Sequence, residues 1–257
     1  METETHMLET AITAARRAGK LLLEASREEI RVDARSRRDV KLEMDRKAEE
    51  VIISTILAAH PDHAVLSEER GRVGGESNWL WVIDPLDGTY NYSRRIPVWC
   101  TSIGLLEDGE ERLGVIYDPI AADLYAAERG RGAAVNGSPA VVSKVASLEE
   151  ATVCFSSGLG NDDLARTMAA AEHLAVAAGK VRGMGAAASH LAYVAGGRAD
   201  AFYDFGAKLW DVAAGIALVR EAGGVVTVRP RGEHTLDIIA SNGKFHEELE
   251  NEIGWQP

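Results

Sequence analysis

An apolar run that stops at two aspartates constrains the fold more than any other feature of this chain. In "WLWVIDPLDGTYNY", the run from Leu80 to Ile83 has the composition of a buried strand, and Asp84 and Asp87 follow it directly. Carboxylates at the end of a buried strand are costly unless they are paired or bind a cation. The end of this strand is therefore expected to lie at the wall of a site that neutralises them.

Length and charge limit the classes of protein that fit. The 257 residues, 46% of them hydrophobic, are enough for one large domain or two closely packed ones. Lys and Arg number 28 against 40 Asp and Glu, a net charge of −12 with no basic block, so the electrostatic footprint of a nucleic-acid-binding protein is absent. An acidic protein that handles an anionic substrate needs local help from metal ions or helix N-termini.

The sequence shows no targeting signal or membrane span, and it contains two cysteines. The start "METETHMLET" has neither the basic residues nor the apolar stretch of a secretory signal, and no run approaches the roughly 18 apolar residues of a membrane span. These observations predict a cytoplasmic protein without membrane contact. Cys100 and Cys154 stand far apart within apolar runs, which favours buried reduced thiols over a disulfide or a zinc site.

Residues 1–148 are predicted to form an α+β domain. Helical spacing predicts helices from Leu8 to about Ser26 and from about Arg46 to Ala59, and the charged stretch "RVDARSRRDVKLEMD" between them is predicted as a solvated loop. Short strands are expected at 64–67, 80–83, 99–106, 113–117 and 124–127, with a hairpin at Asp108-Gly109 and one short strand in "RGRGAAVNGSPAVVS". The helices should pack on a largely antiparallel or mixed sheet.

Residues 149–257 are predicted to form an α/β domain that completes the active site. Strand-like runs ("ATVCFS", around Val181, "ADAFYDF", "GVVTV", "LDIIAS") alternate with helices expected at about 162–178, 186–195 and 210–222, and a short helix ends the chain. The boundary near 145–150 has no Pro/Ser linker or charged tether, so an extensive interface between the two halves is expected.

Three further acidic positions also adjoin apolar elements: Asp45 at a predicted helix start, Glu68-Glu69 after "AVLS", and Asp211 in "LWDVAAG". Taken singly, Asp45 and Asp211 are typical of the first turn of a helix, and Glu68-Glu69 of a surface. Several hard oxygen ligands without a His or Cys cluster favour Mg²⁺ or Mn²⁺ over zinc. His190 lies on a predicted helix and is interpreted as a packed or capping residue rather than a base.

The spacing in Asp84-Pro85-Leu86-Asp87 suits a pair of metal ions that clamp a phosphate ester and activate a water. Asp84 is placed to bridge two metals, while Asp87 turns back to one and the Leu86 carbonyl faces the other. Gly88 lets backbone N–H groups approach a phosphate, and Thr89 begins a short helix whose N-terminus favours an anion.

Three motifs in order resemble the signatures of the inositol monophosphatase family: "SEE" at 67–69, "DPLDGTYNY" at 84–92 and "WDVAAGIALVREAGG" at 210–224. "GVIYDP", "AAVNG" and "VAGGRADAF" extend the resemblance to essentially the whole chain. It implies a layered α/β/α/β/α sandwich of the sugar phosphatase type, a Mg²⁺-dependent and lithium-sensitive phosphatase acting on inositol monophosphate or a related sugar phosphate, and a homodimer.

The resemblance also implies the metal ligands, with two or three Mg²⁺ per site and Mn²⁺ as a possible substitute. The first metal is implied to take Glu68, Asp84 and the Leu86 carbonyl, and the second Asp84, Asp87 and Asp211. A third, weaker Mg²⁺ is implied near Glu68, which thereby counts among the catalytic residues.

Gly88 and Thr89 are implied to hold the phosphate, and Thr89 with Asp45 to orient the water that the metals activate. Attack is implied to be in line, without a phosphoenzyme. Asp204 in "YDFGAKLWD" occupies the position that contacts sugar hydroxyls, and Ala187 is implied to line the sugar pocket.

Some positions depart from the family pattern. Leu42 in "DVKLEMD" replaces a usual Thr, which makes Asp45 the least secure assignment, and Asp204 is shorter than the usual Glu. Arg94 and Arg95 are candidates for contact with a second phosphate, although a surface role fits them equally well.

Several alternative functions stay open. Within the family they are fructose-1,6-bisphosphatase activity, alone or in addition, and less favoured 3′,5′-bisphosphonucleotide or histidinol-phosphate phosphatase activity. A haloacid-dehalogenase mechanism is disfavoured because its two acids are one residue apart, whereas two residues separate Asp84 from Asp87. A regulatory binding protein that retains the fold is the non-enzymatic alternative, disfavoured because the metal carboxylates are all present.

Overall fold

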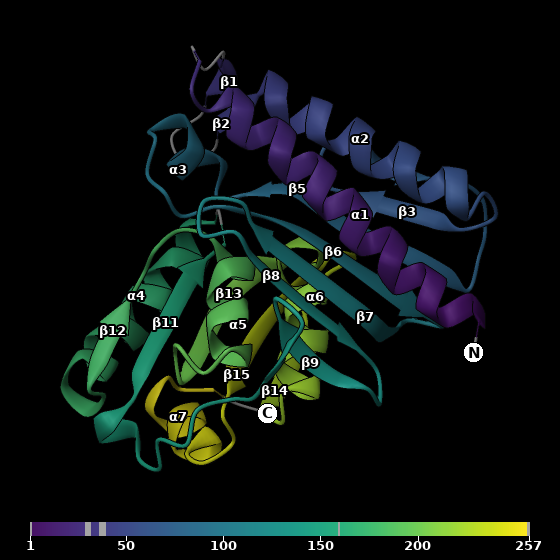
Figure 1. Cartoon of the computed structure of the whole chain (residues 1–257). Helices are drawn as coiled ribbons and strands as arrows, with labels where there is room; N and C mark the ends of the chain where they lie inside the picture. Colours follow the sequence, from purple (N-terminus) through teal and green to yellow (C-terminus); the bar gives the residue numbers. More distant parts are fainter. Residues whose placement is uncertain (1, 29–31, 36–39, 159, 256–257) are drawn as a thin grey trace.

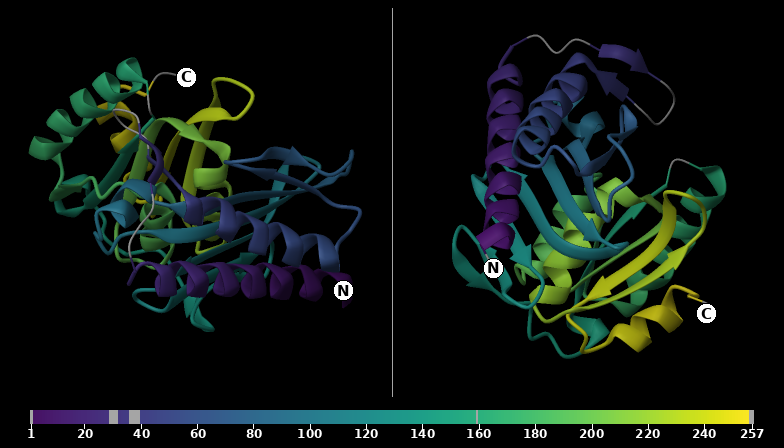
Figure 2. Two further views of the ribbon diagram at one scale, coloured as in Figure 1. Left: turned by 90° about the horizontal axis from the view of Figure 1, so that it is seen from above. Right: turned by 90° about the vertical axis from the view of Figure 1, so that its right-hand side faces the viewer.

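The computed structural model describes residues 2–28, 32–35, 40–158 and 160–255, and within them not the side chains of 2–5, 32–35, 40, 41 and 157. It consists of five layers in the order α/β/α/β/α (Figure 1). Two sheets each carry helices on an outer face, and two further helices fill the space between the sheets, as the views of Figure 2 also show. The predicted sandwich is therefore confirmed.

The first sheet has eight strands in the order β10-β9-β8-β7-β6-β5-β3-β4, in which only β3 and β5 pair in parallel. Helices α1 (Glu2–Ala25) and α2 (Glu43–Ala59) cover its outer face with an apolar core. The strands are β3 (Ala64–Ser67), β4 (Gly71–Val73), β5 (Trp79–Asp87), β6 (Cys100–Glu107), β7 (Glu110–Asp118), β8 (Asp123–Glu128), β9 (Gly132–Val135) and β10 (Ser138–Ala140).

A bulge at the end of β5 orients its two aspartates. Asp84 pairs with Ser102 on β6, whereas Asp87 pairs with Cys100, so β5 contains one extra residue at this point. In a regular strand, residues i and i+3 face opposite sides of the sheet. The bulge brings both aspartates to the same side. Pro85 fits this bulge because it has no N–H to pair, and its carbonyl accepts a hydrogen bond from the Thr101 hydroxyl at 3.0 Å.

The second sheet has five strands in the order β12-β11-β13-β15-β14, and β11 runs parallel to both β12 and β13. The strands are β11 (Thr152–Ser157), β12 (Lys180–Arg182), β13 (Ala201–Lys208), β14 (Val225–Pro230) and β15 (Thr235–Ser241). Helices α4 (Asn161–Ala177) and α7 (His246–Glu252) cover its outer face, while α5 (Ala187–Ala195) and α6 (Leu209–Glu221) lie between the sheets. The short helices are α3 (Thr89–Ser93) and the 3₁₀ turn Leu148–Glu150.

Helix α6 packs unusually close to the first sheet. Gly104 on β6 and Gly114 on β7 are register partners, and both lie under Ala213 and Ala214 of α6. A Cβ on Gly114 would overlap the backbone of Ala214, and one on Gly104 would stand 3.0 Å from the Ala213 Cβ. This glycine pair therefore sets the depth at which α6 sits between the two sheets.

Two predictions for connecting segments were wrong. The stretch predicted as a solvated loop contains an antiparallel pair, β1 (Val32–Arg35) with β2 (Val40–Leu42), while residues 31 and 36–39 lie outside the description. Charged residues obscured the period-two pattern of Val32-Ala34 and Val40-Leu42. The segment predicted to contain one short strand contains two, β9 and β10.

The helix predicted from Leu8 begins more than a turn earlier, at Glu2. The other predicted elements are confirmed within a few residues, as are the hairpin at Asp108-Gly109 and the two buried cysteines without a disulfide. No helix in the described part of the chain is long and apolar enough to cross a membrane.

We expect Gly114→Ala to lower the free energy of unfolding by about 1–3 kcal/mol or more, because the added methyl would have to displace α6. Urea denaturation measures this directly. Gly75→Ala is the matched control, since a Cβ there meets nothing within 4 Å. Equal stability of the two variants would show that the glycine pair does not limit the packing of α6.

Candidate active site

The strand end that holds Asp84 and Asp87 is almost completely shielded from solvent. Asp84 is 2% exposed and Asp87 is 7% exposed. Asp84 Oδ1 accepts a hydrogen bond from the Leu86 N–H at 2.9 Å. Burial raises the pKa of Asp84 well above its ordinary value, and the charges of Glu68, Asp87 and Asp211 raise it further. Glu68, Asp87 and Asp211 therefore lie close enough to Asp84 to disfavour its ionised form.

Asp87 is anchored at the N-terminus of α5. Its carboxylate accepts hydrogen bonds from the N–H groups of Ala187 (3.1 Å), Ala188 (2.8 Å) and Ser189 (3.4 Å). Burial raises the pKa of Asp87 to about 6, and these three N–H groups oppose that rise. A strand of the first sheet is thereby joined to a helix that belongs to the second half of the chain.

Asp211 lies in the first turn of α6, and its Oδ2 accepts a hydrogen bond from the Lys208 N–H at 3.2 Å. The interpretation of Asp211 as an acid in the first turn of a helix is therefore correct. Burial, followed by the charges of Asp87 and Asp204, raises the pKa of Asp211 well above its ordinary value. Asp211, at the start of the third motif, therefore shares the electrostatic environment of Asp84 and Asp87 in the second motif.

Glu68 follows β3 directly, and a buried carboxylate holds the turn that presents it. Glu49 of α2 is 0% exposed and accepts hydrogen bonds from the Ser67 hydroxyl (2.5 Å) and the Arg70 N–H (3.1 Å). The Arg70 guanidinium also pairs with Glu49 at 2.9 Å. Sequence reasoning missed Glu49, although a signal existed: it falls at helical spacing on the apolar face of α2 beside Ile52.

Asp45 and Thr89 hydrogen-bond to different partners. Asp45 is 3% exposed, and its Oδ2 accepts a hydrogen bond from the Leu42 N–H at 2.7 Å. Burial and the charge of Asp45 raise the pKa of Tyr92 to about 12. The Thr89 hydroxyl donates to the Leu86 carbonyl at 2.9 Å, which places two predicted site residues in direct contact.

Gly88 is required by the backbone at the start of α3. Its φ is 93°, in the left-handed region, and a Cβ would stand 2.8 Å from the Val98 carbonyl oxygen. The predicted turn and short helix after the second aspartate are therefore confirmed, with α3 beginning at Thr89.

A cavity of about 420 Å³ adjoins these carboxylates. Its lining residues from the predicted site are Asp87, Ala187, Asp204 and Asp211. Asp204 is 2% exposed, and its Oδ1 has no hydrogen-bond partner among the described residues. Burial first, then the charges of Asp163 and Asp237, raise the pKa of Asp204 to about 8. A buried carboxyl oxygen without a partner, on a residue that lines a cavity, is a candidate ligand-binding group.

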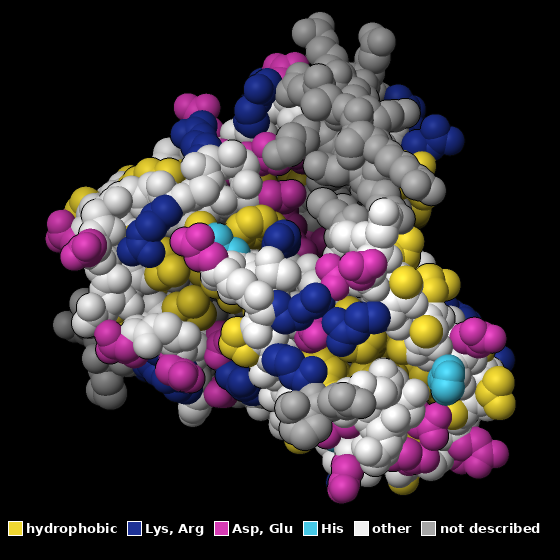
Figure 3. Space-filling model, turned by 180° about the vertical axis from the view of Figure 1, so that it is seen from behind, with side chains coloured by type: hydrophobic (Ala, Val, Ile, Leu, Met, Phe, Trp, Pro, Cys, Tyr) yellow, Lys and Arg dark blue, Asp and Glu magenta, His cyan; other side chains and the backbone are white. Residues whose placement is uncertain are grey.

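The two candidate arginines are not part of this cavity wall. Arg94 and Arg95 are exposed and absent from the lining, and Arg95 Nη2 donates to the Glu28 carbonyl at 3.0 Å. Their contact with a second phosphate stays a prediction. On the face in Figure 3, some acidic side chains lie recessed in a hollow next to the grey atoms, with Lys and Arg side chains on the surface nearby.

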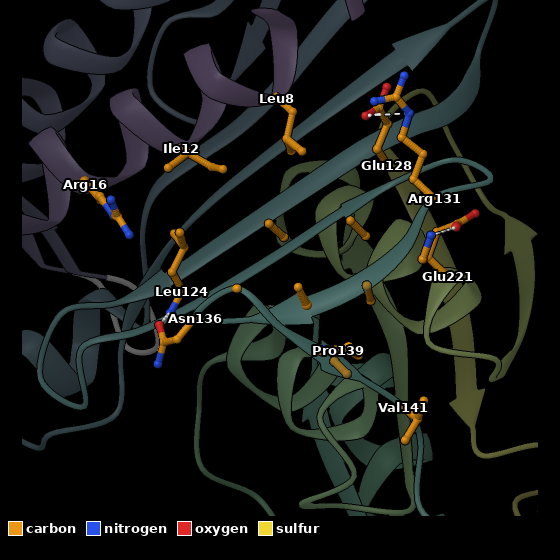
Figure 4. Close-up of a pocket in the computed structure, with 17 residues that line it drawn as sticks. Leu8, Ile12, Arg16, Leu124, Glu128, Arg131, Asn136, Pro139, Val141 and Glu221 are labelled. Carbon is orange, nitrogen blue, oxygen red and sulfur yellow. Dashed lines mark hydrogen bonds and ion pairs between the residues drawn. The ribbon is translucent and has the colours of Figure 1, made fainter. Parts of the chain in front are cut away.

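A larger cavity, of about 800 Å³, lies elsewhere, between α1 and strands β8 to β10 (Figure 4). Its acidic residues are already engaged: Glu128 pairs with Arg131, and Glu221 accepts the N–H groups of Gly130 and Gly132. The remaining wall is mainly apolar. Because no described carboxylate in this wall lacks a partner, we place the chemistry at the smaller cavity.

The donor set fits hard divalent cations. Buried, mutually repelling carboxylates are stable only when protons or cations neutralise them, and carboxylate and carbonyl oxygens are the ligands that Mg²⁺ and Mn²⁺ prefer. The described side chains do not by themselves form a group of three or more His, Cys, Asp or Glu at metal-ligand spacing. Cation binding would therefore draw these carboxylates closer together.

Comparison with known proteins decides the family. The sequence model of the family described as "Inositol monophosphatase family" matches residues 3–254 of this chain. This chain belongs to the inositol monophosphatase family. The order of the three motifs, the layered fold and the grouped carboxylates agree with that membership.

Curated and solved members of the inositol monophosphatase family cover nearly the whole chain. Nus factor SuhB from Xylella fastidiosa is 39% identical, over 94% of this chain and 92% of that protein. Inositol-1-monophosphatase from Synechocystis sp. is 40% identical, over 85% of this chain and 78% of that protein. The solved structure of inositol monophosphatase from Anabaena (Nostoc) sp. has a TM-score of 0.86 at 36% identity, over 100% of this chain and 98% of that chain. The names differ, so membership supports a phosphatase without fixing its substrate.

The raised pKa of Asp204 predicts a pH dependence of stability. An unfolded aspartate has a pKa of about 3.9, whereas that of folded Asp204 is about 8, so the folded state holds one more proton between these values. The stabilising contribution of this protonation is full below about pH 4 and is lost as the pH rises through about 8. In EDTA, the unfolding free energy of the wild type should fall more steeply with pH than that of Asp204→Asn.

Urea denaturation between pH 5 and pH 8 measures the difference, which should approach about 1.4 kcal/mol per pH unit. Asp162→Asn, an exposed aspartate on α4, is the control and should follow the wild type. Parallel curves for the wild type and Asp204→Asn would contradict the assignment of a raised pKa to Asp204.

Proposed function

We propose that this protein is a Mg²⁺-dependent phosphatase that hydrolyses inositol monophosphate or a related sugar phosphate. The observation that carries the proposal is the grouping of Asp84, Asp87 and Asp211, from strands and helices of both halves, beside a cavity that Asp204 also lines. Such a group of buried carboxylates supports cation binding, and a neighbouring cavity with Asp204 and Ser156 in its wall supports a small hydroxylated substrate.

Glu68, Asp84, the Leu86 carbonyl, Asp87 and Asp211 would hold two Mg²⁺ ions, with a third near Glu68 and Mn²⁺ as a substitute. When bound, the ions supply charge that offsets the substrate phosphate and lowers the pKa of a water. The three N–H groups of α5 leave Asp87 fixed in orientation before any ligand arrives. The protein thus holds the Asp87 carboxylate in place before a cation binds, and the other carboxylates would approach it on binding.

The residues after β5 are proposed to bind the phosphate and position the water. Gly88 brings backbone N–H groups close to the ligand because it has no side chain, and its left-handed φ starts the helix that follows. In this structure the Thr89 hydroxyl donates a hydrogen bond to the Leu86 carbonyl. In the substrate complex, Thr89 and Asp45 would together orient the attacking water. Asp204 and Ala187 would contact the alcohol part of the ester, since both line the cavity.

Other parts of the proposal rest on less direct grounds. Lithium inhibition and a homodimer rest on the family resemblance, whereas a cytoplasmic location and the lack of nucleic-acid and membrane partners are expectations from composition and charge. Size-exclusion chromatography with light scattering tests the dimer, and a lithium titration of the Mg²⁺-dependent activity tests inhibition.

We expect Asp84→Asn to lower kcat/KM for Mg²⁺-dependent phosphate release by about 100-fold or more, because an amide neutralises the cations less well. The variant should also lose the rise in thermal midpoint that Mg²⁺ gives the wild type. Asp108→Asn is the control, because Asp108 lies in the hairpin between β6 and β7. Full activity of Asp84→Asn would exclude the metal-carboxylate mechanism, and a wild type without Mg²⁺-dependent phosphate release would favour a regulatory binding protein.

A panel of four esters separates the candidate substrates: inositol 1-phosphate, fructose 1,6-bisphosphate, histidinol phosphate and a 3′,5′-bisphosphonucleotide. We expect the highest kcat/KM for inositol 1-phosphate, because the cavity offers Asp204 to ring hydroxyls and does not include Arg94 or Arg95 to meet a second phosphate. Equal or absent hydrolysis of inositol 1-phosphate would instead favour fructose-1,6-bisphosphatase or another member activity.

A further inference from the structure

A buried histidine stands behind the wall of the candidate substrate cavity. His190, one turn into α5, is 0% exposed and packs against the Phe202 ring, with the two ring centroids 5.4 Å apart. Its Nδ1 lies 3.2 Å from the Ser156 hydroxyl, and its Nε2 lies 3.2 Å from the Met184 N–H. Both ring nitrogens are therefore engaged, one of them by a group that lines the cavity.

The contact with Met184 fixes the tautomer of the ring. A backbone N–H can only donate, so Nε2 must accept and carries no proton. Burial lowers the pKa of His190 to about 3, so the ring is neutral at physiological pH and its one proton resides on Nδ1. The Nδ1–H then donates to Ser156, whose oxygen accepts.

This direction leaves the Ser156 hydroxyl proton free for a ligand. Ser156 lines the cavity, and no other hydrogen bond of its hydroxyl occurs among the described residues. Its register partner on the adjacent parallel strand is Asp204, whose Oδ1 is buried and also without a partner in the described structure. Neighbouring strands lie about 4.8 Å apart and register partners face the same side, so a ligand in the cavity that both residues line can contact both side chains.

We propose that His190 is a positioning residue that holds the Ser156 hydroxyl as a donor toward the substrate, so that the cavity selects phosphate esters whose alcohol part carries a hydroxyl. A substrate hydroxyl would accept a hydrogen bond from Ser156 and contact the Asp204 carboxyl group, since both residues line the cavity. This inference rests on the proposed phosphatase function and specifies which part of the ester the protein reads.

The test compares two substrates in the same enzyme with Mg²⁺: inositol 1-phosphate, which carries ring hydroxyls, and phenyl phosphate, which carries none. We expect Ser156→Ala and His190→Leu each to lower the kcat/KM ratio of the first to the second roughly tenfold, mainly through KM, as the loss of one hydrogen bond requires. His190→Asn, which keeps a donor near the Nδ1 position, should stay within about threefold of the wild-type ratio.

The double variant Ser156→Ala/His190→Leu should lose no more than Ser156→Ala alone, because both changes remove one interaction. His173→Leu, an exposed histidine on α4, is the control and should leave the ratio unchanged. An unchanged ratio in Ser156→Ala, or equal losses in His190→Asn and His190→Leu, would overturn the proposal. If the wild type hydrolyses neither ester, the phosphatase proposal itself has failed.

A measurement without substrate tests the geometry directly, and it decides the matter if His190→Leu does not fold. Long-range ¹H–¹⁵N spectra of the wild type, with His190 assigned by its absence in His190→Asn, should show a neutral ring protonated at Nδ1. A proton on Nε2 would overturn the proposal, because Nδ1 would then accept from Ser156 and occupy the hydroxyl proton.

Discussion

The position of helix α6 between the two sheets is the constraint on which the rest of the structure depends. Its backbone approaches the first sheet at Gly104 and Gly114, where side chains of any size would hold it away. The first turn of the helix carries Asp211, so the depth of packing decides whether this carboxylate stands with Asp84, far earlier in the chain. The hydrogen bonds from the N-terminus of α5 to Asp87 also hold the second half of the chain against the first sheet.

The site concentrates repulsion that the surrounding layers must outweigh. Burial raises the pKa values of Asp84, Asp87 and Asp211, and neighbouring carboxylates raise those of Asp84 and Asp211 further. The ionised forms therefore destabilise the folded protein when nothing neutralises them. Apolar cores on both sides of each sheet supply the opposing free energy. A functional site that is locally unfavourable and globally supported is a common arrangement in enzymes, and it explains why cations are expected to stabilise this fold.

The sequence predicted the elements that bear the acids better than the geometry between them. The apolar run followed by two aspartates correctly predicted β5. The two aspartates face the same side of the sheet only because of a bulge, and this bulge depends on the pairing of Asp87 with Cys100 on β6. Glu49 was missed because an isolated acid in a helix is usually exposed, and only its place on the apolar stripe distinguished it. His190 was correctly predicted to be packed, yet its link to Ser156 joins residues 34 positions apart and leaves no local pattern.

The central claim is that carboxylates from both halves of the chain form one divalent-cation site. Anomalous difference density from crystals grown with Mn²⁺ tests it most directly, because Mn²⁺ scatters anomalously and prefers the same oxygen ligands as Mg²⁺. The account predicts peaks enclosed by the carboxylates of Asp84, Asp87 and Asp211. The protein used for the crystals must first be shown to release phosphate in the presence of Mn²⁺. If Mn²⁺ peaks then occur only at other places in the structure, the account is contradicted.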